Sequence, residues 1–265
     1  MAKIHFCHKV FKIKRNLVDV LQSTMTVEEA ILYRRSTREF DAEKEISTEK
    51  VKRCLELASL APNSSNMQLW EFYHVTDKET MKSLTRACLD QNSMKTAKEV
   101  VVFVTRQDLF YRRSKEMLKL EYEDIERYSP EDRKEPRRKN RKRYYGFLMP
   151  FLYARFVGLL GVLRKIIASV VGLFQPMTRE VSEEEIYAVV HKSCALAAQN
   201  FMIAMAGQGY DTCPLEGFDS KMVKKILDLP YGSSVNMIIP CGIRTEAGVR
   251  RTQLRVPFEE VYKRI

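Results

Sequence analysis

The strongest constraint on the fold of this chain is a short run of apolar residues, Val100 to Val104, which contains no polar side chain. Such a run is typical of a β-strand buried on both faces, because a half-exposed strand alternates apolar and polar residues. Residues 235–240 also read as a core strand, and residues 70–75 as a strand rich in aromatic side chains. Longer segments with helical spacing lie between these strands. Helices and strands are therefore expected to interleave around a buried sheet, with more helix than strand.

Capping residues mark the starts of the predicted helices. Thr26 with Glu29, and Ser182 with Glu185, each form a capping box, in which two side chains satisfy N–H groups that a helix start leaves free. The helix that follows Ser182 is rich in alanine, which lets another backbone approach closely, so we expect this helix to be central. Further helix starts are expected at Ser47 or Thr48, at Asp77 and at Asp219.

The composition indicates a globular protein with reduced thiols. Its 265 residues are 45 % apolar, which is enough for an ordinary core. The cysteines are scattered, with no Cys-x-x-Cys pair and no histidine at metal-ligand spacing, so we expect a cytoplasmic protein without a metal site. They are Cys7, Cys54, Cys88, Cys194, Cys213 and Cys241. Residues 1–15 lack the continuous apolar stretch of a signal peptide, and secretion is not expected.

The net charge of +11 is concentrated in residues 133–143, which hold eight cations and one anion. No aromatic residue lies in this run, so stacking on bases, and with it nucleic-acid binding, is not expected. Residues 147–174 are mostly apolar but contain Arg155, Arg164 and Lys165, which argue against a transmembrane helix. Two interpretations of this region stay open. Residues 108–179 form a helical excursion whose apolar residues pack on a second copy of the chain or over a functional site, or residues 133–174 make peripheral contact with an anionic membrane.

A cluster of arginines and hydroxyls closes the first predicted helix. Arg34, Arg35, Ser36, Thr37 and Arg38 combine three guanidinium groups with two hydroxyls. This donor set suits a phosphate, because a guanidinium group can bind two phosphate oxygens at once. Alternatively, the cluster is a solvated basic helix end, which the helix dipole favours.

Three further segments offer polar groups or a close backbone approach. Residues 61–70 combine a helix stop, a run of short polar side chains and the start of a strand. In residues 213–218, Pro214 fixes the path of the chain and Gly217 permits a planar ligand to approach the backbone. A second basic cluster lies near the C-terminus and consists of Arg250, Arg251 and Arg255.

In this order and spacing, the segments resemble the FMN-dependent nitroreductase family. The match covers roughly residues 26–104 and 182–257, and it rests on the motifs Arg-x-Ser-x-Arg, Ala-Pro-x-x-x-Asn-x-Gln-x-Trp and Pro-x-Glu-Gly-Phe. The resemblance implies an α+β fold with a mixed central sheet flanked by helices, and an interlocked homodimer with one FMN per subunit interface. It also implies that NADH or NADPH reduces the FMN, which then reduces a nitroaromatic, a quinone or a similar small-molecule acceptor.

The resemblance implies roles for individual residues as well. Arg34 and Ser36 match positions that hold the flavin phosphate, and Arg38 matches a cation at the pyrimidine edge of the ring, where it stabilises the reduced flavin. The loop at 62–66 would come from the partner subunit, and the turn at 214–217 would face the ring. The expected cofactor contacts are Arg34, Arg35, Ser36, Arg38, Pro62, Asn63, Ser64, Asn66, Gln91, Asn92, Pro214, Leu215, Glu216, Gly217 and Arg255. No catalytic residue beyond the flavin is expected, since the flavin carries the reaction.

Two positions depart from the family pattern. Gln253 stands where a lysine is often found, two residues before the phosphate ligand Arg255, so Arg250 or Arg251 is expected to supply part of the charge. The segment before the second strand also differs, and the flavin contacts expected there are Gln91 or Asn92.

The domain organisation follows from the same match. We expect an N-terminal extension at residues 1–25, one nitroreductase-like FMN-binding domain at 26–265, and a long helical insertion at about 108–179. Two functional classes stay open. The first is an FMN-dependent NAD(P)H oxidoreductase, and the second is a non-catalytic basic protein that binds membrane or nucleic acid on a nitroreductase-like fold.

Overall fold

A computed structural model of the chain describes residues 25–265. The expected N-terminal extension, residues 1–25, lies almost entirely outside the described residues, and so does Cys7. The described part begins directly before the first capping box, in which Thr26 accepts from the backbone of Glu29 and its own N–H donates to the Glu29 carboxylate.

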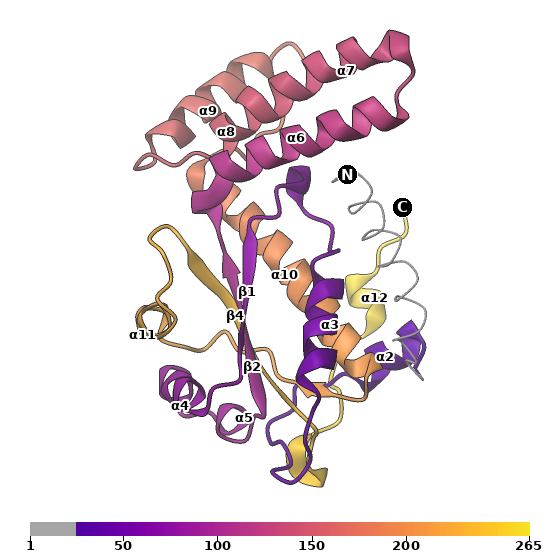
Figure 1. Ribbon diagram of the computed structural model, residues 1–265, viewed down its shortest axis with the longest axis vertical. Coiled ribbons are helices and arrows are strands. Elements are labelled where there is room, and N and C mark those ends of the chain that lie inside the picture. The colour runs from indigo at the N-terminus through magenta and orange to yellow at the C-terminus, as the bar shows by residue number, and fades with distance from the viewer. Residues whose placement is uncertain (1–24) are drawn as a thin grey trace, which may run out of the picture.

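A four-stranded sheet forms the centre of the described structure (Figure 1). Its strands are β1 (Trp70–Val75), β2 (Glu99–Thr105), β3 (Asp211–Thr212) and β4 (Ser234–Gly242). They lie in the order β1-β2-β4-β3, each neighbour antiparallel to the next, and an isolated parallel bridge joins Ser36 to Thr212 beside β3. The strand β2 is buried along its whole length, and the apolar run Val100–Val104 predicts this burial for all but its two end residues.

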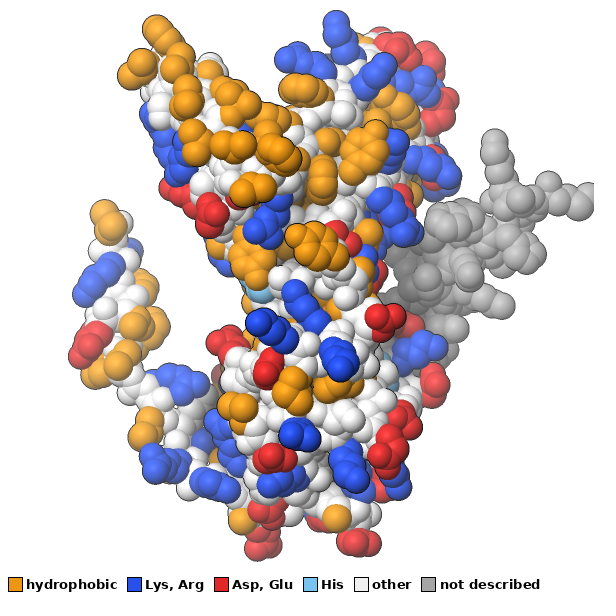
Figure 2. Space-filling view, turned by 90° about the vertical axis from the view of Figure 1, so that its left-hand side faces the viewer, with side chains coloured by type: hydrophobic (Ala, Val, Ile, Leu, Met, Phe, Trp, Pro, Cys, Tyr) orange, Lys and Arg blue, Asp and Glu red, His pale blue; other side chains and the backbone are white. Residues whose placement is uncertain are grey.

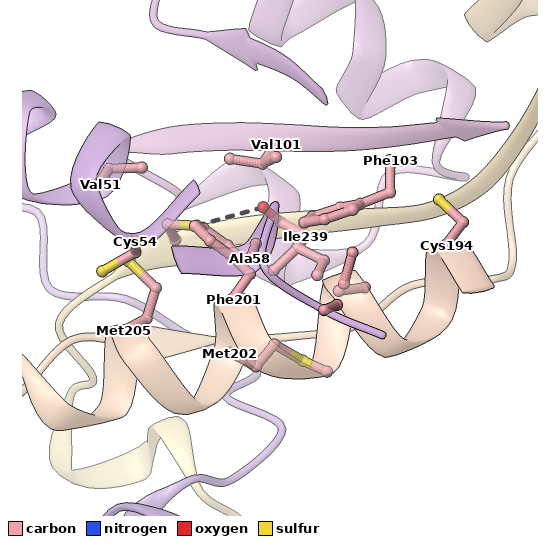
Figure 3. Packing of buried hydrophobic residues seen from close by; sticks show 14 of the residues in the cluster. Val51, Cys54, Ala58, Val101, Phe103, Cys194, Phe201, Met202, Met205 and Ile239 are labelled. Atoms are coloured by element: carbon pink, nitrogen blue, oxygen red, sulfur yellow. Dashed lines mark hydrogen bonds between the residues drawn. The ribbon is translucent and has the colours of Figure 1, made fainter. Parts of the chain in front are cut away.

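One face of the sheet is covered by α10 (Glu183–Gly207), with α3 (Thr48–Ala58) and α2 (Val27–Tyr33) packed against this helix (Figure 1). Figure 3 shows Phe201 of α10 beside Phe103 of β2, with ring centroids 5.6 Å apart. The alanines of α10 at the middle of this contact are fully buried, so the helix lies close to the sheet. The expectation of a central alanine-rich helix is confirmed.

The opposite face is covered by α4 (Lys78–Ala87), α5 (Asn92–Lys95) and α11 (Ser220–Ile226). Alternate side chains of β2 pack into the cores on the two faces of the sheet, because successive side chains of a strand point to opposite sides. Val101 and Phe103 belong to the core under α10, whereas the valines at 100, 102 and 104 belong to the core under α4 and α11.

Four α-helices extend from the end of the sheet that carries the last residues of β2 (Figure 1, top). They are α6 (Phe110–Tyr128), α7 (Glu131–Arg143), α8 (Met149–Tyr153) and α9 (Leu159–Val171), with a π-helical turn at Tyr144–Leu148 between α7 and α8. We call them the α6–α9 segment. The turn at Ser129 and Pro130 separates α6 from α7, where the sequence predicts an interruption. Within residues 25–265, no helix has both the length and the apolar character needed to cross a membrane.

The remaining elements are short. They are the 3-10 helices η1 (Ser64–Asn66), η2 (Gln107–Leu109) and η4 (Glu246–Gly248), and the C-terminal helix α12 (Phe258–Val261). The helix starts predicted at Ser47, Asp77, Ser182 and Asp219 are confirmed, since each of these side chains accepts a hydrogen bond from a backbone N–H of the first turn.

Candidate functional site

A cavity of about 570 Å³ lies between residues 34–38 and residues 249–255. These two segments are more than 200 positions apart in the sequence and meet beside β3. Six arginines line the cavity, and none of the described residues that line it is acidic. The arginines are Arg34, Arg35, Arg38, Arg250, Arg251 and Arg255. Both basic clusters noted in the sequence therefore contribute to one site.

Backbone hydrogen bonds fix the path of the first segment. The helix α2 ends before Arg34, and from there the chain runs beside β3. The N–H of Thr37 donates to the carbonyl of Thr212 at 3.1 Å, and the N–H of Arg38 donates to that of Gly248 at 2.7 Å. Thr37 is fully buried, while its neighbours Ser36 and Arg38 are exposed at the cavity. Alternation along an extended chain thus presents these two residues together.

The cavity has a strongly positive environment that lacks counter-charges. Burial lowers the pKa of Arg34, and the nearby cations Arg255 and Arg35 lower the pKa further. Within the described residues, Arg34, Arg38 and Arg255 form no ion pair with a carboxylate. Arg35 instead donates to the backbone carbonyl of Arg251 at 2.5 Å, which ties the two segments together. Such a group of unpaired guanidinium groups is chemically suited to an anion with several oxygens.

The turn at 214–217 is connected to this cavity through Gln91 and Asn92. Leu215 exchanges two backbone hydrogen bonds with Ile238 of β4, which holds the turn against the sheet. The amide of Gln91 donates to the carbonyl of Gly217 at 2.9 Å, and the amide of Asn92 donates to the carbonyl of Arg38 at 3.2 Å. Gln91 and Asn92, both expected flavin contacts, therefore join the turn to the arginine segment. Of the remaining turn residues, Pro214 is half-buried and Glu216 is exposed.

The loop at 62–66 has a rigid geometry of its own. Asn63 accepts from the N–H of Gln68 at 2.8 Å, and the side chain of Gln68 donates to Asn66 at 3.2 Å. Ser65, Asn66 and Gln68 all have positive φ angles of 47–54°. A positive φ is uncommon for residues other than glycine, and clusters of this kind are found at binding loops.

This loop lies far from the arginine cavity within one chain. The N–H of Ser64 donates to Ser193 in the first half of α10, whereas Tyr33, next to the cavity, donates to Gly209 just past the end of α10. The fourteen residues that follow Ser193, up to the end of α10 at Gly207, correspond to about 21 Å of helix. The structure therefore brings together the residues at 34–38, 91–92, 214–217 and 255, and it leaves Pro62, Asn63, Ser64 and Asn66 apart from them.

Three tyrosines that the sequence did not link to the site hold this loop. Tyr144 shares a hydrogen bond with the hydroxyl of Ser65 at 2.8 Å, and Tyr145 donates to the carbonyl of Ser65 at 2.9 Å. Tyr153 reaches the carbonyl of Ser64 at 3.5 Å. The signal in the sequence was three tyrosines in an otherwise apolar stretch, since buried tyrosines need a partner for the hydroxyl group.

Comparison with known proteins identifies the family. The model of the nitroreductase family matches residues 31–243, and the chain belongs to that family. The resemblance noted in the three sequence motifs is thereby confirmed, and so is the α+β fold class.

The relatives agree with this assignment. The chain is 27 % identical over 234 residues to Protein DrgA of Synechocystis, covering 87 % of this chain and 91 % of that protein. Two solved structures share the fold at 18 % identity. One is a putative NAD(P)H:FMN oxidoreductase of Staphylococcus epidermidis, with a TM-score of 0.68 over 91 % of this chain and 96 % of that one. The other is a putative nitroreductase of Exiguobacterium sibiricum in complex with FMN, with a TM-score of 0.64 over 91 % and 98 %.

Proposed function

We propose that the protein is an FMN-dependent oxidoreductase that takes electrons from NADH or NADPH and passes them to a nitroaromatic, a quinone or a similar acceptor. The observation that carries the proposal is the cavity with six arginines, formed at the positions where the family motifs lie. Two structural neighbours support it, since one is described as an NAD(P)H:FMN oxidoreductase and another contains FMN.

The residues that line the cavity fit the phosphate end of FMN. A phosphate monoester carries between one and two negative charges at neutral pH and three acceptor oxygens. Arg34, Ser36 and Arg255 offer guanidinium and hydroxyl donors that no carboxylate engages in the described structure. At the turn, a Cβ added to Gly217 would meet only the amide of Gln91, at 3.7 Å, so this surface is open to a planar ring.

When bound, FMN supplies the redox chemistry by accepting a hydride from the nicotinamide and delivering electrons to the acceptor. The residues of the chain bind and orient the cofactor. Arg38 would place a fixed positive charge beside the pyrimidine edge of the ring, which favours the reduced, more negative form. Its backbone is held on both sides, by Gly248 and by Asn92, so the point from which the side chain extends is fixed before the cofactor arrives.

We propose that the functional unit is a homodimer. The loop at 62–66 and the cavity at 34–38 are separated along α10 within one chain, and a second copy would bring the loop of one subunit to the cavity of the other. The strained backbone of Ser65 and Asn66, fixed by the α6–α9 segment, is suited to such a contact because it is organised in advance.

We further propose that the enzyme is cytoplasmic. Its residues 133–174 would be available for contact with an anionic membrane. The five described cysteines are free and buried, and no disulfide occurs between residues 25 and 265. Free thiols in this number are typical of a reducing compartment.

Anaerobic stopped-flow spectroscopy tests the proposed reaction. Protein loaded with FMN is mixed with NADH or NADPH, and the visible absorbance of the flavin is expected to bleach. Addition of a quinone or a nitroaromatic compound is then expected to restore it. Failure of both nucleotides to bleach protein that contains stoichiometric FMN would refute the proposed electron donor and with it the proposed reaction.

A further inference from the structure

The outer face of α9 is apolar and uncovered in the described part of the chain. Its exposed side chains lie on one side of the helix at helical spacing, and each has between 40 and 85 % of its surface exposed. We call this set, which includes two residues just after the helix, the apolar face: Leu159, Val162, Leu163, Ile166, Ile167, Val170, Leu173 and Phe174. A surface helix in water normally turns a polar face outward, and α9 does the reverse.

The two cationic side chains of α9 form their contacts with the protein itself. Arg164 is 3 % exposed, and its guanidinium group donates to the carbonyls of Leu160 and Ala154 at 3.0 and 2.9 Å. Lys165 pairs with Glu185 of α10 at 2.7 Å. The inner side of the helix is thus fixed by hydrogen bonds and an ion pair, and the apolar face cannot turn inward without breaking them.

Four further large apolar side chains are exposed in the residues before α9. Phe147 and Leu148 are exposed in the π-helical turn, and Phe156 and Val157 are exposed in the connection to α9, with Val157 at 92 %. Figure 2 shows hydrophobic side chains gathered over the upper part of the molecule, where the α6–α9 segment lies, with Lys and Arg side chains close by. An exposed apolar patch of this extent marks an interaction surface.

The neighbouring helix α7 supplies positive charge that the protein does not neutralise. Some of its cations pair with glutamates of α6 and α7, as Arg141 does with Glu121 at 2.9 Å. Others are exposed and form no ion pair within the described residues: Arg133, Arg137, Lys139, Lys142 and Arg143. Unpaired cations next to an apolar helix face are the pattern of a segment that lies at the surface of an anionic bilayer.

We propose that the apolar face of α9 lies in the headgroup region of an anionic bilayer, with the unpaired cations of α7 on the lipid phosphates. The length of α9, 13 residues, is too short to span a membrane and is typical of an interfacial helix. This inference does not depend on the flavin, because neither helix contributes a residue to the arginine cavity.

Charge favours lipid over a second copy of the chain as the occupant of this surface. A two-fold contact through α9 would bring two copies of α7 toward each other, each with the same uncompensated cations, and like charges repel. An anionic bilayer instead offers negative charge to α7 and an apolar layer to α9 at the same time.

Flotation with lipid vesicles tests the proposal on the full chain. Vesicles rich in phosphatidylserine are compared with vesicles of phosphatidylcholine alone, at low and at high salt. The protein is expected to float with the anionic vesicles at low salt, to bind the neutral vesicles more weakly, and to lose part of its binding at high salt.

Two variants separate the apolar and the ionic contributions. Ile166→Glu puts a charge at the centre of the apolar face and should reduce vesicle binding at least tenfold. Its control, Leu89→Glu, changes an exposed leucine between α4 and α5 and should bind like the unchanged protein. Lys139→Gln with Lys142→Gln should weaken binding roughly 25-fold, about fivefold for each cation.

A matched charge control and a fold control complete the design. Lys82→Gln with Lys221→Gln removes two exposed lysines far from α7 and should leave binding unchanged. Circular dichroism and thermal midpoints confirm that each variant is folded. The proposal is overturned if the unchanged protein stays unbound to anionic vesicles at low salt, or if Ile166→Glu binds as well as Leu89→Glu. Loss of a higher oligomer in Ile166→Glu, without vesicle binding by the unchanged protein, would assign the face to a second copy instead.

Discussion

The environment of Arg34 strongly favours binding of an anion. Arg34 is half-buried, and its pKa is lowered by burial and by the charges of Arg255 and Arg35. Within the described residues, no carboxylate forms an ion pair with its guanidinium group. We predict that Arg34→Ala weakens FMN binding by about 1.5 to 3 kcal/mol, the range for hydrogen bonds to charged groups, which is about 10- to 150-fold in Kd. Quenching of flavin fluorescence on titration with the apoprotein measures this Kd.

Arg86→Ala is the matched control for this change. Arg86 is an exposed arginine of α4 outside the cavity, so its loss should leave the Kd for FMN unchanged. Equal Kd values for Arg34→Ala and the unchanged protein would contradict the assignment of the phosphate site.

His191 makes the stability of the fold depend on pH. Burial lowers the pKa of His191, and its Nδ1 atom accepts from the amide of Asn236 at 3.1 Å, an arrangement that favours the neutral ring. Because the unfolded chain takes up the proton first, this contribution to stability is present above a pH of about 6.5 and is lost as the pH falls below it. The thermal midpoint should therefore fall between pH 7 and pH 5, and by less in His191→Gln. Parallel curves for the two proteins would show that His191 is not responsible.

At the scale of elements, the helix caps and the core strands were predictable because their causes are local. The capping box at Thr26 requires only a glutamate or glutamine three positions later in the sequence, here Glu29. The burial of β2 follows from the five consecutive apolar residues within it. The exposed face of α9 was not predictable in this way. The same apolar spacing would suit a helix packed against the core, and the burial of Gly161, Arg164 and Ala168 shows which side faces inward.

The contact between α9 and α10 depends on a glycine. A Cβ at Gly161 would lie 2.8 Å from the backbone N of Glu183, where nothing flexible can yield. We predict that Gly161→Ala lowers the free energy of unfolding by about 1 to 3 kcal/mol, the usual cost of overpacking. Gly146→Ala is the control, since its Cβ would meet only Lys142 at 3.8 Å, and it should be neutral or stabilising. Urea denaturation measures the stability of both variants, and equal stabilities would contradict a close contact between Gly161 and the start of α10.

At the scale of the whole molecule, the sequence motifs indicated candidate site residues, but their spacing could not show which of these residues lie close together in the fold. Arg34 and Arg255 are more than 200 positions apart in the sequence. They line one cavity because Arg35 donates to the carbonyl of Arg251 and the N–H of Arg38 donates to that of Gly248. The distance between the 62–66 loop and the arginine cavity depends on the length of α10. Distances of this kind follow from tertiary packing, which no single motif contains.

A homodimer with shared sites predicts complementation between two defective chains. Arg34→Ala damages the cavity, and Asn66→Asp damages the loop that the other subunit would supply. A mixed dimer of the two would have one intact site, formed by the unchanged cavity of one chain and the unchanged loop of the other. Co-expression should therefore restore activity to about a quarter of that of the unchanged protein, as expected for random pairing of a two-fold dimer. No recovery above the separate variants would argue that each site is built within one chain.

The most direct test of the central claim is the flavin content of the protein itself. Purified protein is incubated with excess FMN, freed of unbound cofactor, and its visible spectrum and FMN-to-chain ratio are measured. The cavity at Arg34, Ser36, Arg38 and Arg255 predicts a yellow protein with about one FMN per chain, and a ratio well below this in Arg34→Ala. A colourless protein that stays free of FMN after this treatment would contradict the assignment of the arginine cavity and the oxidoreductase function built on it.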